Sequence, residues 1–399
     1  MGVRIIIGKS FGDEGKGLAV DYFARQALKK DMPCLVVRHN GGAQAGHTVD
    51  LPESRFVFHQ LSSGSFCRAD TLWADTFLPD LYKLPEEAAD FCAAGGTLPH
   101  IMAFGGCACV VIDDVLLNIA LETARGRNRH GSCGMGIDEA VQRSKHAPYR
   151  LTLRQIKGLS AGALYRTLRD IRSAYLDRRL RELGLSPAKA GSYGELLFSD
   201  NVLRNAAEGM CRGAELVEII PASRTESYGE VIFEGAQGLL LDENYLDYAP
   251  YLTPSRTGLM QPLRLCRELF GKTDAEAVYV SRTYVTRHGQ GPLPHEGAFA
   301  GSLSVTDDTN RPNEWQGALR FAPHGTPQEF FAPLRADAGE EAVRRSLLLT
   351  HLNETGGCVC TVWGNLPLAQ WCGDYGADRF FDRLYLSETR FSADISIFQ

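Results

Sequence analysis

The sequence predicts an α/β protein with a large, mainly parallel central sheet and helices on both faces. Short apolar runs typical of strands alternate with longer stretches of helical periodicity through the first part of the chain. The first apolar run ends in a glycine-rich loop that leads straight into a helix. With 399 residues, 44% of them hydrophobic, the chain is long enough to bury a large core between these elements.

The glycine-rich loop, residues 8–17, reads GKSFGDEGKG. An apolar run at 3–7 precedes it, and helical periodicity over 18–28 follows it. A strand, a glycine loop and a helix in this order direct backbone N–H groups and the positive end of the helix dipole towards phosphate. The alternative is a tight turn that binds nothing, but such a turn needs one or two glycines and this loop has four. The stretch therefore predicts a P-loop-NTPase-like phosphate site after the first strand.

The loop is not a Walker A sequence. Ser10 stands where that motif has its first glycine, and Gly17 replaces the Ser or Thr that would hold Mg²⁺. The loop also contains the acidic pair Asp13 and Glu14, and carboxylates repel phosphate unless a metal or a catalytic duty intervenes. The composition of the loop therefore points to chemistry at phosphate rather than to simple binding.

The remaining pattern predicts one domain over residues 1–399, with a helical insertion at about 151–215. No repeat, low-complexity tract or linker divides the chain. Apolar runs predict strands at 33–37, 55–59 and 109–113, and helical periodicity predicts helices at 80–92, 115–124 and 151–183.

Composition and charge narrow the class of partner. The net charge of −6 argues against non-specific binding to nucleic acid or to anionic membranes. No apolar run approaches transmembrane length, and the N-terminus enters a strand without a basic region and cleavage site. Eleven cysteines are scattered without a CxxC spacing, which favours reduced thiols and a cytoplasmic location over disulfides or zinc.

A second glycine-rich stretch, VVRHNGGAQAGHT at 36–48, follows the first. Together the two stretches resemble the adenylosuccinate synthetase family, whose members join aspartate to IMP with GTP and carry G-D-E-G-K-G followed by G-G-x-N-A-G-H-T. The resemblance is dense up to Pro292 and thin beyond it. It continues through stretches similar to the family's other motifs, at 131–137, 233–242, 250–253 and 284–292.

The resemblance implies a C–N bond-forming ligase that uses Mg²⁺. Such an enzyme phosphorylates the 6-oxo group of an IMP-like purine nucleotide with a nucleoside triphosphate, and the amine of aspartate or a related amino acid then displaces the phosphate. Asp13 would be the base that removes the N1 proton, and Asp13 and Gly46 would bind Mg²⁺. Lys16 would neutralise the phosphates, and His47 would donate a hydrogen bond to the oxygen that takes on charge.

The resemblance also assigns three sets of binding residues. The triphosphate would be bound by Gly12, Glu14, Gly15, Gly17, Gly46, Thr48, His351 and Asn353. The purine monophosphate would be bound by Gln44, Ser132, Cys133, Arg143, Gln237 and Thr253. The amino acid would be bound by Arg311. In the family an arginine reaches the monophosphate of the neighbouring subunit; Arg143 is the candidate for it, which implies a homodimer.

Some of these positions depart from the family pattern. Gln44 stands in place of an asparagine, and Cys133 in place of a hydroxyl. The amino-acid loop keeps Arg311 where the family has several arginines, so amino acids other than aspartate are open. At the end of the triphosphate site, Asn353 replaces the aspartate that pairs with guanine in the family's T-K-L-D. An amide both donates and accepts, so ATP is as open as GTP.

Two alternatives to this reading are open. One is the phage-type aspartate ligase that acts on dGMP, in which the loop aspartate is replaced, whereas Asp13 is present here. The other is a paralogue that binds or hydrolyses nucleotide and regulates without ligation. The presence of Asp13, Lys16 and His47 together favours the ligase over both.

Overall fold

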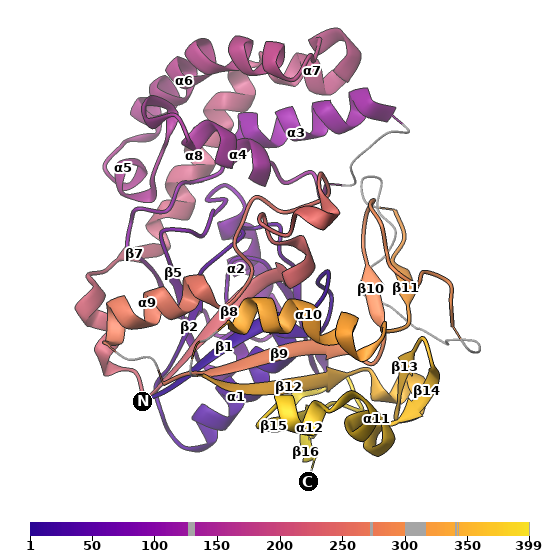
Figure 1. Cartoon of the computed structure of the whole chain (residues 1–399). Helices are drawn as coiled ribbons and strands as arrows, with labels where there is room; N and C mark the ends of the chain where they lie inside the picture. The colour runs from indigo at the N-terminus through magenta and orange to yellow at the C-terminus, as the bar shows by residue number, and fades with distance from the viewer. Residues whose placement is uncertain (127–131, 272–273, 300–316, 340, 342, 399) are drawn as a thin grey trace.

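The computed structural model describes residues 1–126, 132–271, 274–299, 317–339, 341 and 343–398. A ten-stranded sheet forms the centre of the molecule, in the order β16-β15-β12-β9-β1-β8-β2-β5-β6-β7 (Figure 1). Its strands pair in parallel, except that β16 is antiparallel to β15. The strands are β1 (Gly2–Gly8), β2 (Cys34–Arg38), β5 (Asp70–Trp73), β6 (Ile101–Ala103), β7 (Val217–Ile219), β8 (Glu230–Gly238), β9 (Glu276–Arg282), β12 (Arg344–Thr350), β15 (Arg383–Leu386) and β16 (Ser396–Phe398).

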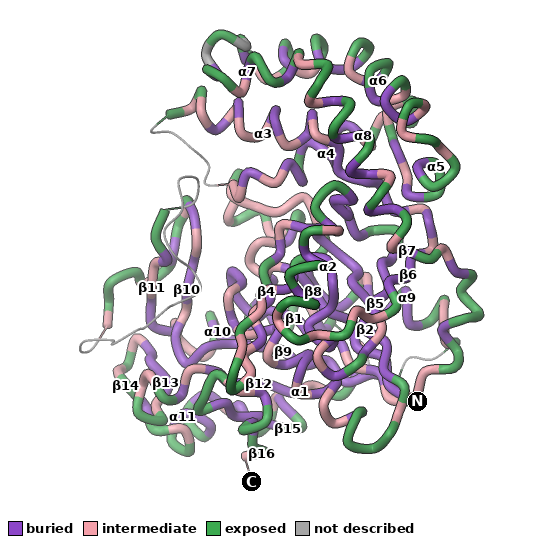
Figure 2. Tube along the Cα trace, turned by 180° about the vertical axis from the view of Figure 1, so that it is seen from behind, coloured by how far each residue is buried: buried purple, intermediate pink, exposed green. Residues whose placement is uncertain are grey.

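Both faces of this sheet are buried, because alternate residues of each central strand enter different cores. Ile5 and Ile7 of β1 belong to the core beneath α9 (Met260–Phe270) and α10 (Pro327–Ala338). Ile6 belongs to the opposite core, against α1 (Lys16–Lys29). Figure 2 shows the central strands as buried over most of their length. A parallel sheet buried on both faces is the predicted fold class, and the prediction is confirmed.

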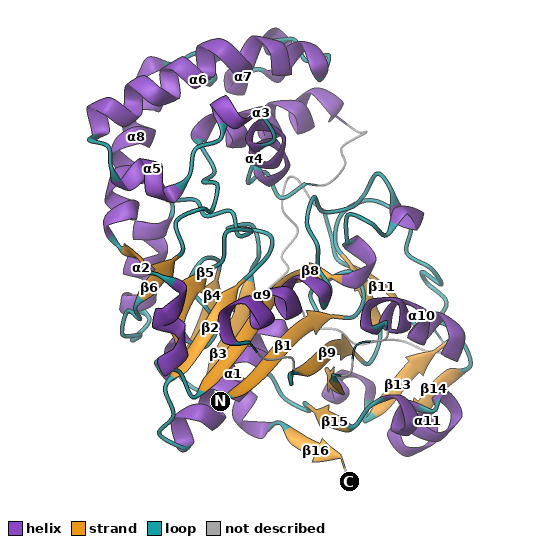
Figure 3. Ribbon diagram, turned by 60° about the vertical axis from the view of Figure 1, so that its left-hand side comes forward, coloured by secondary structure: helices purple, strands orange, loops and turns teal. Residues whose placement is uncertain are grey.

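A second layer of helices stands beside the edge of the sheet that ends in β7 (Figure 3). Its helices pack on one another through two apolar clusters. The stretch 151–215, predicted to be helical, contains four of them. The helices are α3 (Ile112–Arg125), α4 (Ile137–Ser144), α5 (Leu153–Lys157), α6 (Ala161–Glu182), α7 (Ser192–Leu196) and α8 (Asp200–Glu215).

The other elements are shorter and surround the sheet. Within the described ranges, three two-stranded antiparallel sheets lie outside it: β3 (His47–Leu51) with β4 (Ser54–Phe58), β10 (Val285–Arg287) with β11 (Arg320–Ala322), and β13 (Cys358–Thr361) with β14 (Gly364–Pro367). The remaining helices are α2 (Leu84–Ala93), α11 (Leu368–Tyr375) and α12 (Ala377–Phe380). None of the described helices is both long and apolar enough to cross a membrane.

Two of the predicted strands differ from the prediction in the structure. The run at 55–59 is extended, but it forms β4 of a separate hairpin and not a strand of the main sheet. The strand predicted at 109–113 is wrong, because α3 begins at Ile112. Asp114 in the first turn accepts a hydrogen bond at 3.0 Å from the backbone N–H of Val111, and acidic side chains favour the N-terminus of a helix. This capping overrides the β propensity of the valines.

All eleven cysteines are free thiols, as predicted. Cys358 and Cys360 alternate along β13, in agreement with the sequence pattern. Cys107 and Cys109 lie in extended chain around a single bridge between Ala108 and Thr152, and both are buried. Burial raises the pKa of Cys107 to about 12, so this thiol is unreactive near neutral pH.

Close packing at Gly213 gives a test of the fold. A methyl group there would overlap the backbone carbonyl of Leu81. We expect Gly213→Ala to lower the free energy of unfolding by about 1–3 kcal/mol, the usual cost of overpacking. Gly373→Ala is the matched control, because Gly373 lies inside α11 with no atom within 4 Å of the added carbon. Alanine should stabilise that helix. Denaturant unfolding of both variants checks this, and equal effects would contradict the packing of α8.

Candidate active site

The carboxyl ends of β1, β2, β8, β9 and β12 meet at one edge of the sheet, and the glycine loop emerges there from β1. The loop places Gly12 at φ 97°, Asp13 at φ 57° and Gly15 at φ 99°, all in the left-handed region. Glycine adopts this region freely, and aspartate tolerates it better than most residues. Gly15 is the N-cap of α1, which begins at Lys16. The unpaired N–H groups of the first helical turn are therefore directed towards this edge.

The second glycine-rich stretch lies against the first turn of α1. A side chain at Gly17 would place its first carbon 2.9 Å from the carbonyl oxygen of Thr48 and 3.1 Å from atoms of His47. These distances are shorter than normal contact, so only glycine permits the approach. Because of it, Lys16, Gly17, His47 and Thr48 come together as the sequence predicted. Gly46, the residue before His47, is exposed.

The two acidic residues of the loop face different environments. Glu14 is 3% exposed, accepts a hydrogen bond from the backbone N–H of Ser10, and lies 3.8 Å from the amino group of Lys16. Burial raises the pKa of Glu14, and the charge of Lys16 opposes that rise. Asp13 is half-exposed, and its carboxylate has no hydrogen bond or ion pair with any described residue. Glu14 thus braces the inside of the loop, while Asp13 is available to a ligand.

His47 is paired with a buried carboxylate. Its Nδ1 lies 2.5 Å from an oxygen of Glu234, which follows Phe233 in β8 and is completely buried. Glu234 also accepts hydrogen bonds from the hydroxyl of Ser63 and, at 3.2 Å, from its N–H, and lies 3.9 Å from Nε of Arg38. The pair fixes the plane of the imidazole ring. In the sequence, Glu234 lies within the family-like stretch 233–242, but nothing there indicated that it would pair with His47.

The pKa values of this pair follow from its surroundings. Burial by itself would raise the pKa of Glu234, but the charges of His47 and Arg38 and the hydrogen bonds from His47 and Ser63 outweigh it and lower the pKa to about 2. Burial lowers the pKa of His47 to about 4, although Glu234 acts in the opposite direction. At neutral pH without ligand, His47 is thus neutral with its proton on Nδ1, facing the carboxylate.

Two of the residues predicted to bind the purine monophosphate lie near the two glycine-rich stretches: Gln237 is beside the loop at 8–17, and Gln44 is within the stretch at 36–48. Gln237, at φ 64° near the end of β8, places its side-chain oxygen 3.9 Å from the position of a carbon added to Gly12. Gln44 has a buried side-chain oxygen without a hydrogen-bond partner among the described residues. A buried polar atom of this kind is costly unless a ligand or water pairs with it. Thr253 is half-exposed, and its backbone N–H donates a hydrogen bond at 2.8 Å to the carbonyl oxygen of Leu241.

Ser132 and Cys133 lie in the loop before α4. The hydroxyl of Ser132 exchanges hydrogen bonds with the side chain of Asn118, at 2.9 and 3.1 Å. Burial raises the pKa of the Cys133 thiol. Gly131, the first residue of this motif, is outside the described part of the chain, as is Arg311, the predicted amino-acid ligand.

The role predicted for Arg143 is not supported by its position. The side chain is 1% exposed, forms an ion pair with Asp114 at 2.8 Å, and donates to the carbonyl oxygens of Cys109 and Tyr149. Reaching a neighbouring subunit would leave Asp114 buried without its counter-charge, which is strongly unfavourable. Arg143 is therefore corrected to a residue that holds α3 and α4 together. The homodimer stays a prediction, but the position of Arg143 no longer supports it.

The segment predicted to recognise the triphosphate base follows β12. His351 has φ 62°, its Nδ1 lies 2.8 Å from the hydroxyl of Thr350, and its ring meets that of Tyr284 edge-on at 6.0 Å. Asn353 is exposed. Thr350 donates a hydrogen bond at 2.9 Å to the carbonyl oxygen of Glu14. The segment is thus joined directly to the glycine loop.

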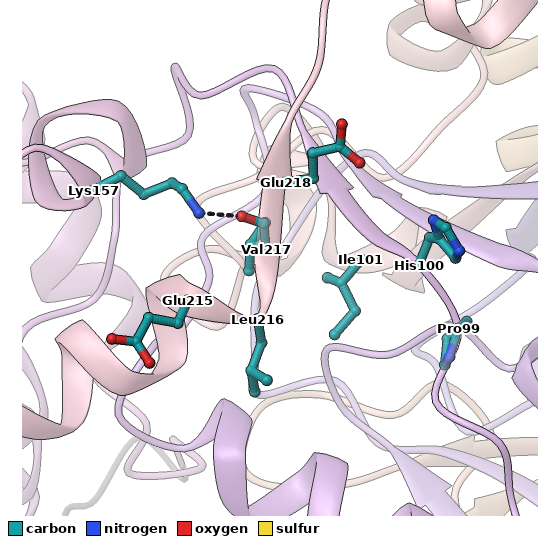
Figure 4. A pocket seen from close by; sticks show the side chains of 8 residues that line it. All are labelled: Pro99, His100, Ile101, Lys157, Glu215, Leu216, Val217 and Glu218. Atoms are coloured by element: carbon teal, nitrogen blue, oxygen red, sulfur yellow. Dashed lines mark hydrogen bonds between the residues drawn. The ribbon is translucent and has the colours of Figure 1, made fainter.

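A hollow of about 350 Å³ lies elsewhere on the molecule, beside the edge strand β7. Figure 4 shows Lys157 turned towards the carbonyl oxygen of Val217, and Lys157 also donates to that of Ala214 at 2.8 Å. This lysine thus caps the end of α8. Strand β7 is the fifth along from β1, about 24 Å away at the usual strand spacing. The hollow is therefore separate from the glycine loop.

The oxygen atoms at the loop suit Mg²⁺. The Asp13 carboxylate and the exposed backbone of Gly46 offer the hard donors that this ion prefers. Within the described ranges, no three His, Cys, Asp or Glu side chains gather as metal ligands. Mg²⁺ in nucleotide sites needs no such cage, because one or two protein oxygens and the phosphates suffice.

The fold and the loop place the chain among α/β proteins with a glycine-rich loop after the first strand of a mainly parallel sheet. A sequence profile described as adenylosuccinate synthetase matches residues 5–312, and the chain belongs to that family. The resemblance seen in the sequence is therefore confirmed.

Similar proteins agree with this assignment. The chain is 27% identical over 296 residues to the adenylosuccinate synthetase of Thermosipho africanus, covering 73% of this chain and 66% of that protein. It is 31% identical over 305 residues to that of Methylococcus capsulatus, covering 73% of this chain and 64% of that protein. The matched region thus spans a little under two thirds of the length of these relatives.

Two solved structures share the fold. Fully ligated adenylosuccinate synthetase from Plasmodium falciparum superposes with a TM-score of 0.65 and 15% identity, over 100% of this chain and 99% of that one. The succinoaminodeoxyadenylate synthetase of cyanophage S-2L, bound to dGMP and to dATP as an energy donor, superposes with a TM-score of 0.61 and 15% identity, over 99% and 95%.

The pairing of His47 with Glu234 has a consequence for titration. In Glu234→Gln the imidazolium loses its counter-charge, so we expect the pKa of His47 to fall below its value of about 4. Nitrogen-15 NMR titration of histidine-labelled protein measures the pKa of His47 in the wild type and in the variant. Glu230→Gln, which removes a buried carboxylate at the start of β8, should leave His47 unchanged. A wild-type midpoint near 6.5, or equal shifts in both variants, would contradict the pairing.

Proposed function

We propose that the protein is a ligase of the adenylosuccinate synthetase type. It phosphorylates the 6-oxo group of a purine nucleoside monophosphate with a nucleoside triphosphate, and an amino acid such as aspartate displaces that phosphate through its amine. The observation that carries the proposal is that Asp13, half-exposed and unpaired among the described residues, lies in the loop that leads into Lys16, and that His47 packs on Gly17 in the same helical turn as Lys16. Family membership supports it.

Asp13 acts as the base in this proposal. A purine oxo group becomes nucleophilic when the proton on N1 is removed, which needs a carboxylate within hydrogen-bond reach. The Asp13 carboxylate has no competing partner among the described residues, and its backbone carbonyl is held at 2.6 Å by Nε of Arg282. Gln237 lies beside the loop and supplies an amide to the same nucleotide.

Lys16, the first turn of α1 and His47 act on the phosphates. The N–H groups and the positive helix end stabilise phosphate oxygens, and Lys16 adds a full charge. An incoming phosphate raises the pKa of His47, and Glu234 favours the same charged form from the other side. The ring then donates from Nε2 to phosphate and from Nδ1 to Glu234. Mg²⁺, held by Asp13 and Gly46, would neutralise charge on the transferring phosphoryl group.

The triphosphate in this proposal is ATP at least as readily as GTP. A carboxylate that faces guanine makes two charge-assisted hydrogen bonds, and a site built that way rejects adenine. Asn353 has a neutral amide at this position and is exposed at the end of the strand. The fold is shared with a phage enzyme whose bound energy donor is dATP.

The experiment that tests the function is a matrix of purine monophosphates, amino acids and triphosphates, read by mass spectrometry. IMP, dGMP, aspartate, ATP and GTP are its central members. A condensed product that requires all three substrates supports a ligase. Phosphate release that needs neither a monophosphate nor an amino acid would instead indicate the non-ligating alternative.

The first prediction from this function concerns the base. Asp13→Ala and Asp13→Asn should both abolish turnover, because neither side chain takes a proton, while the thermal unfolding midpoint stays close to that of the wild type. Steady-state rates with the active substrate combination measure the loss. Asp90→Asn, on the exposed face of α2, is a matched control that should be fully active. More than a few per cent of activity in Asp13→Asn would exclude the role.

The second prediction concerns the base of the triphosphate. We expect ATP to support turnover at least as well as GTP, and His351→Lys combined with Asn353→Asp to shift the preference towards GTP. The kcat/KM ratio for each triphosphate in both proteins measures this. A wild type that prefers GTP by about a hundredfold, the scale of recognition by a charged pair, would show that the base binds elsewhere.

A further inference from the structure

The backbone of Asp13 is held from the end of β9. Arg282, the last residue of that strand, is 5% exposed, and its Nε–H donates to the carbonyl oxygen of Asp13 at 2.6 Å. Asp13 has φ 57°, in the left-handed region that is unfavourable for a residue with a side chain. A charge-assisted hydrogen bond is strong enough to offset that cost. Arg282 therefore stabilises the backbone conformation that sets the direction of the Asp13 carboxylate.

The guanidinium of Arg282 is in turn connected to the segment after β12. Its Nη1–H donates at 3.0 Å to the hydroxyl oxygen of Tyr284, and that hydroxyl donates to the carboxylate of Glu354. Tyr284 is 1% exposed, so both hydrogen bonds are shielded from water. Glu354 directly follows Asn353, and the ring of Tyr284 contacts that of His351. The chain of contacts thus runs from the segment 351–354, which follows β12, to Asp13.

We propose that Arg282, Tyr284 and Glu354 are positioning residues that couple the triphosphate-base segment to the orientation of Asp13. The inference rests on the proposed function, in which Asp13 is the base and residues 351–353 contact the triphosphate base. Ordering of 351–354 by a bound base fixes the Glu354 carboxylate, then the Tyr284 hydroxyl and the Arg282 guanidinium, and so the Asp13 carbonyl. The enzyme thereby prepares its base only when the phosphoryl donor is bound.

A neighbouring contact supports the same coupling. The hydroxyl of Thr350 donates at 2.9 Å to the carbonyl oxygen of Glu14, the residue after Asp13. Two successive carbonyl groups of the glycine loop are therefore held by side chains from the ends of β9 and β12. Because these strands are hydrogen-bonded neighbours, a shift of the segment after β12 is transmitted to both carbonyl groups.

The test compares four variants with one matched control. Arg282→Met and Tyr284→Phe interrupt the chain, Arg282→Lys retains the charge, and Glu354→Gln removes the final carboxylate. Tyr279→Phe is the control, because Tyr279 is also a buried tyrosine of this region whose hydroxyl donates to a carboxylate, Asp337, at 2.9 Å, but it does so on the other side of the sheet. A stability loss alone would appear in the control as well.

The expected kinetic result is a loss in kcat rather than in binding. Arg282→Met should lower kcat roughly ten- to a hundredfold, the scale of a hydrogen bond to a charged group, with little change in the KM for the purine monophosphate. Arg282→Lys should recover part of that loss. Tyr284→Phe and Glu354→Gln should not be additive, because each interrupts the same chain. Additive losses, or a lysine variant no better than methionine, would overturn the coupling.

Hydrogen–deuterium exchange gives a readout that does not depend on turnover. In the wild type, addition of adenosine, which has the base but lacks the phosphates that would contact the loop directly, should slow exchange in peptides covering residues 8–17 and 351–354 together. In Tyr284→Phe only the second peptide should respond fully, whereas in Tyr279→Phe both should. If both peptides respond alike in all three proteins, the coupling is wrong. If no substrate combination is ligated, the proposed function fails, and this exchange pattern still decides the coupling. Should Arg282→Met not fold, Tyr284→Phe and Glu354→Gln carry the test.

Discussion

Gly17 has no side chain, and the assembly of the site depends on that absence. The carbonyl oxygen of Thr48 lies only 2.9 Å from where any larger residue would place its first carbon, so glycine lets the second glycine-rich stretch rest on the first turn of α1. That contact brings His47 beside Lys16 and the helix N-terminus, where negative charge is favoured. With a bulkier residue at this position, the histidine and the phosphate loop would be separated although each could keep its local fold.

Buried charge at this edge of the sheet is balanced locally. Glu234 is matched by Arg38, His47 and Ser63, and Glu14 by Lys16 and a backbone N–H. Each of these carboxylates would be very costly without its partners. Asp13 differs, because its carboxylate has no partner among the described residues. The site thus keeps a frame of paired charges around one acid that is left for a ligand.

The sequence predicted the parts of this protein that depend on local signals. The apolar run, four glycines and helix of residues 3–28 specified β1, the loop and α1, and the later glycine-rich motifs specified the family. Glu234 as the partner of His47 could not be predicted, because His47 of β3 and Glu234 of β8 are brought together only by tertiary packing, in which both strands contact α1. Arg143 was misassigned for the same reason. From the sequence, an arginine near a phosphate motif is expected to be a ligand. Only the packing of α4 on α3 shows that Arg143 pairs with the buried Asp114.

The order of strands also determines when this site can come into existence. Strand β1 is synthesised before β8 and β9, yet Gly2 pairs with Glu230 of β8, and Arg4 pairs with Glu276 of β9. The side chain of Thr350, later still, completes the contacts of the loop. Contacts so distant along the chain close slowly, and the first strand must wait with both edges unpaired. The glycine-rich loop therefore precedes all the strands on which its contacts depend, and it can be assembled only after Thr350 of β12 has been made.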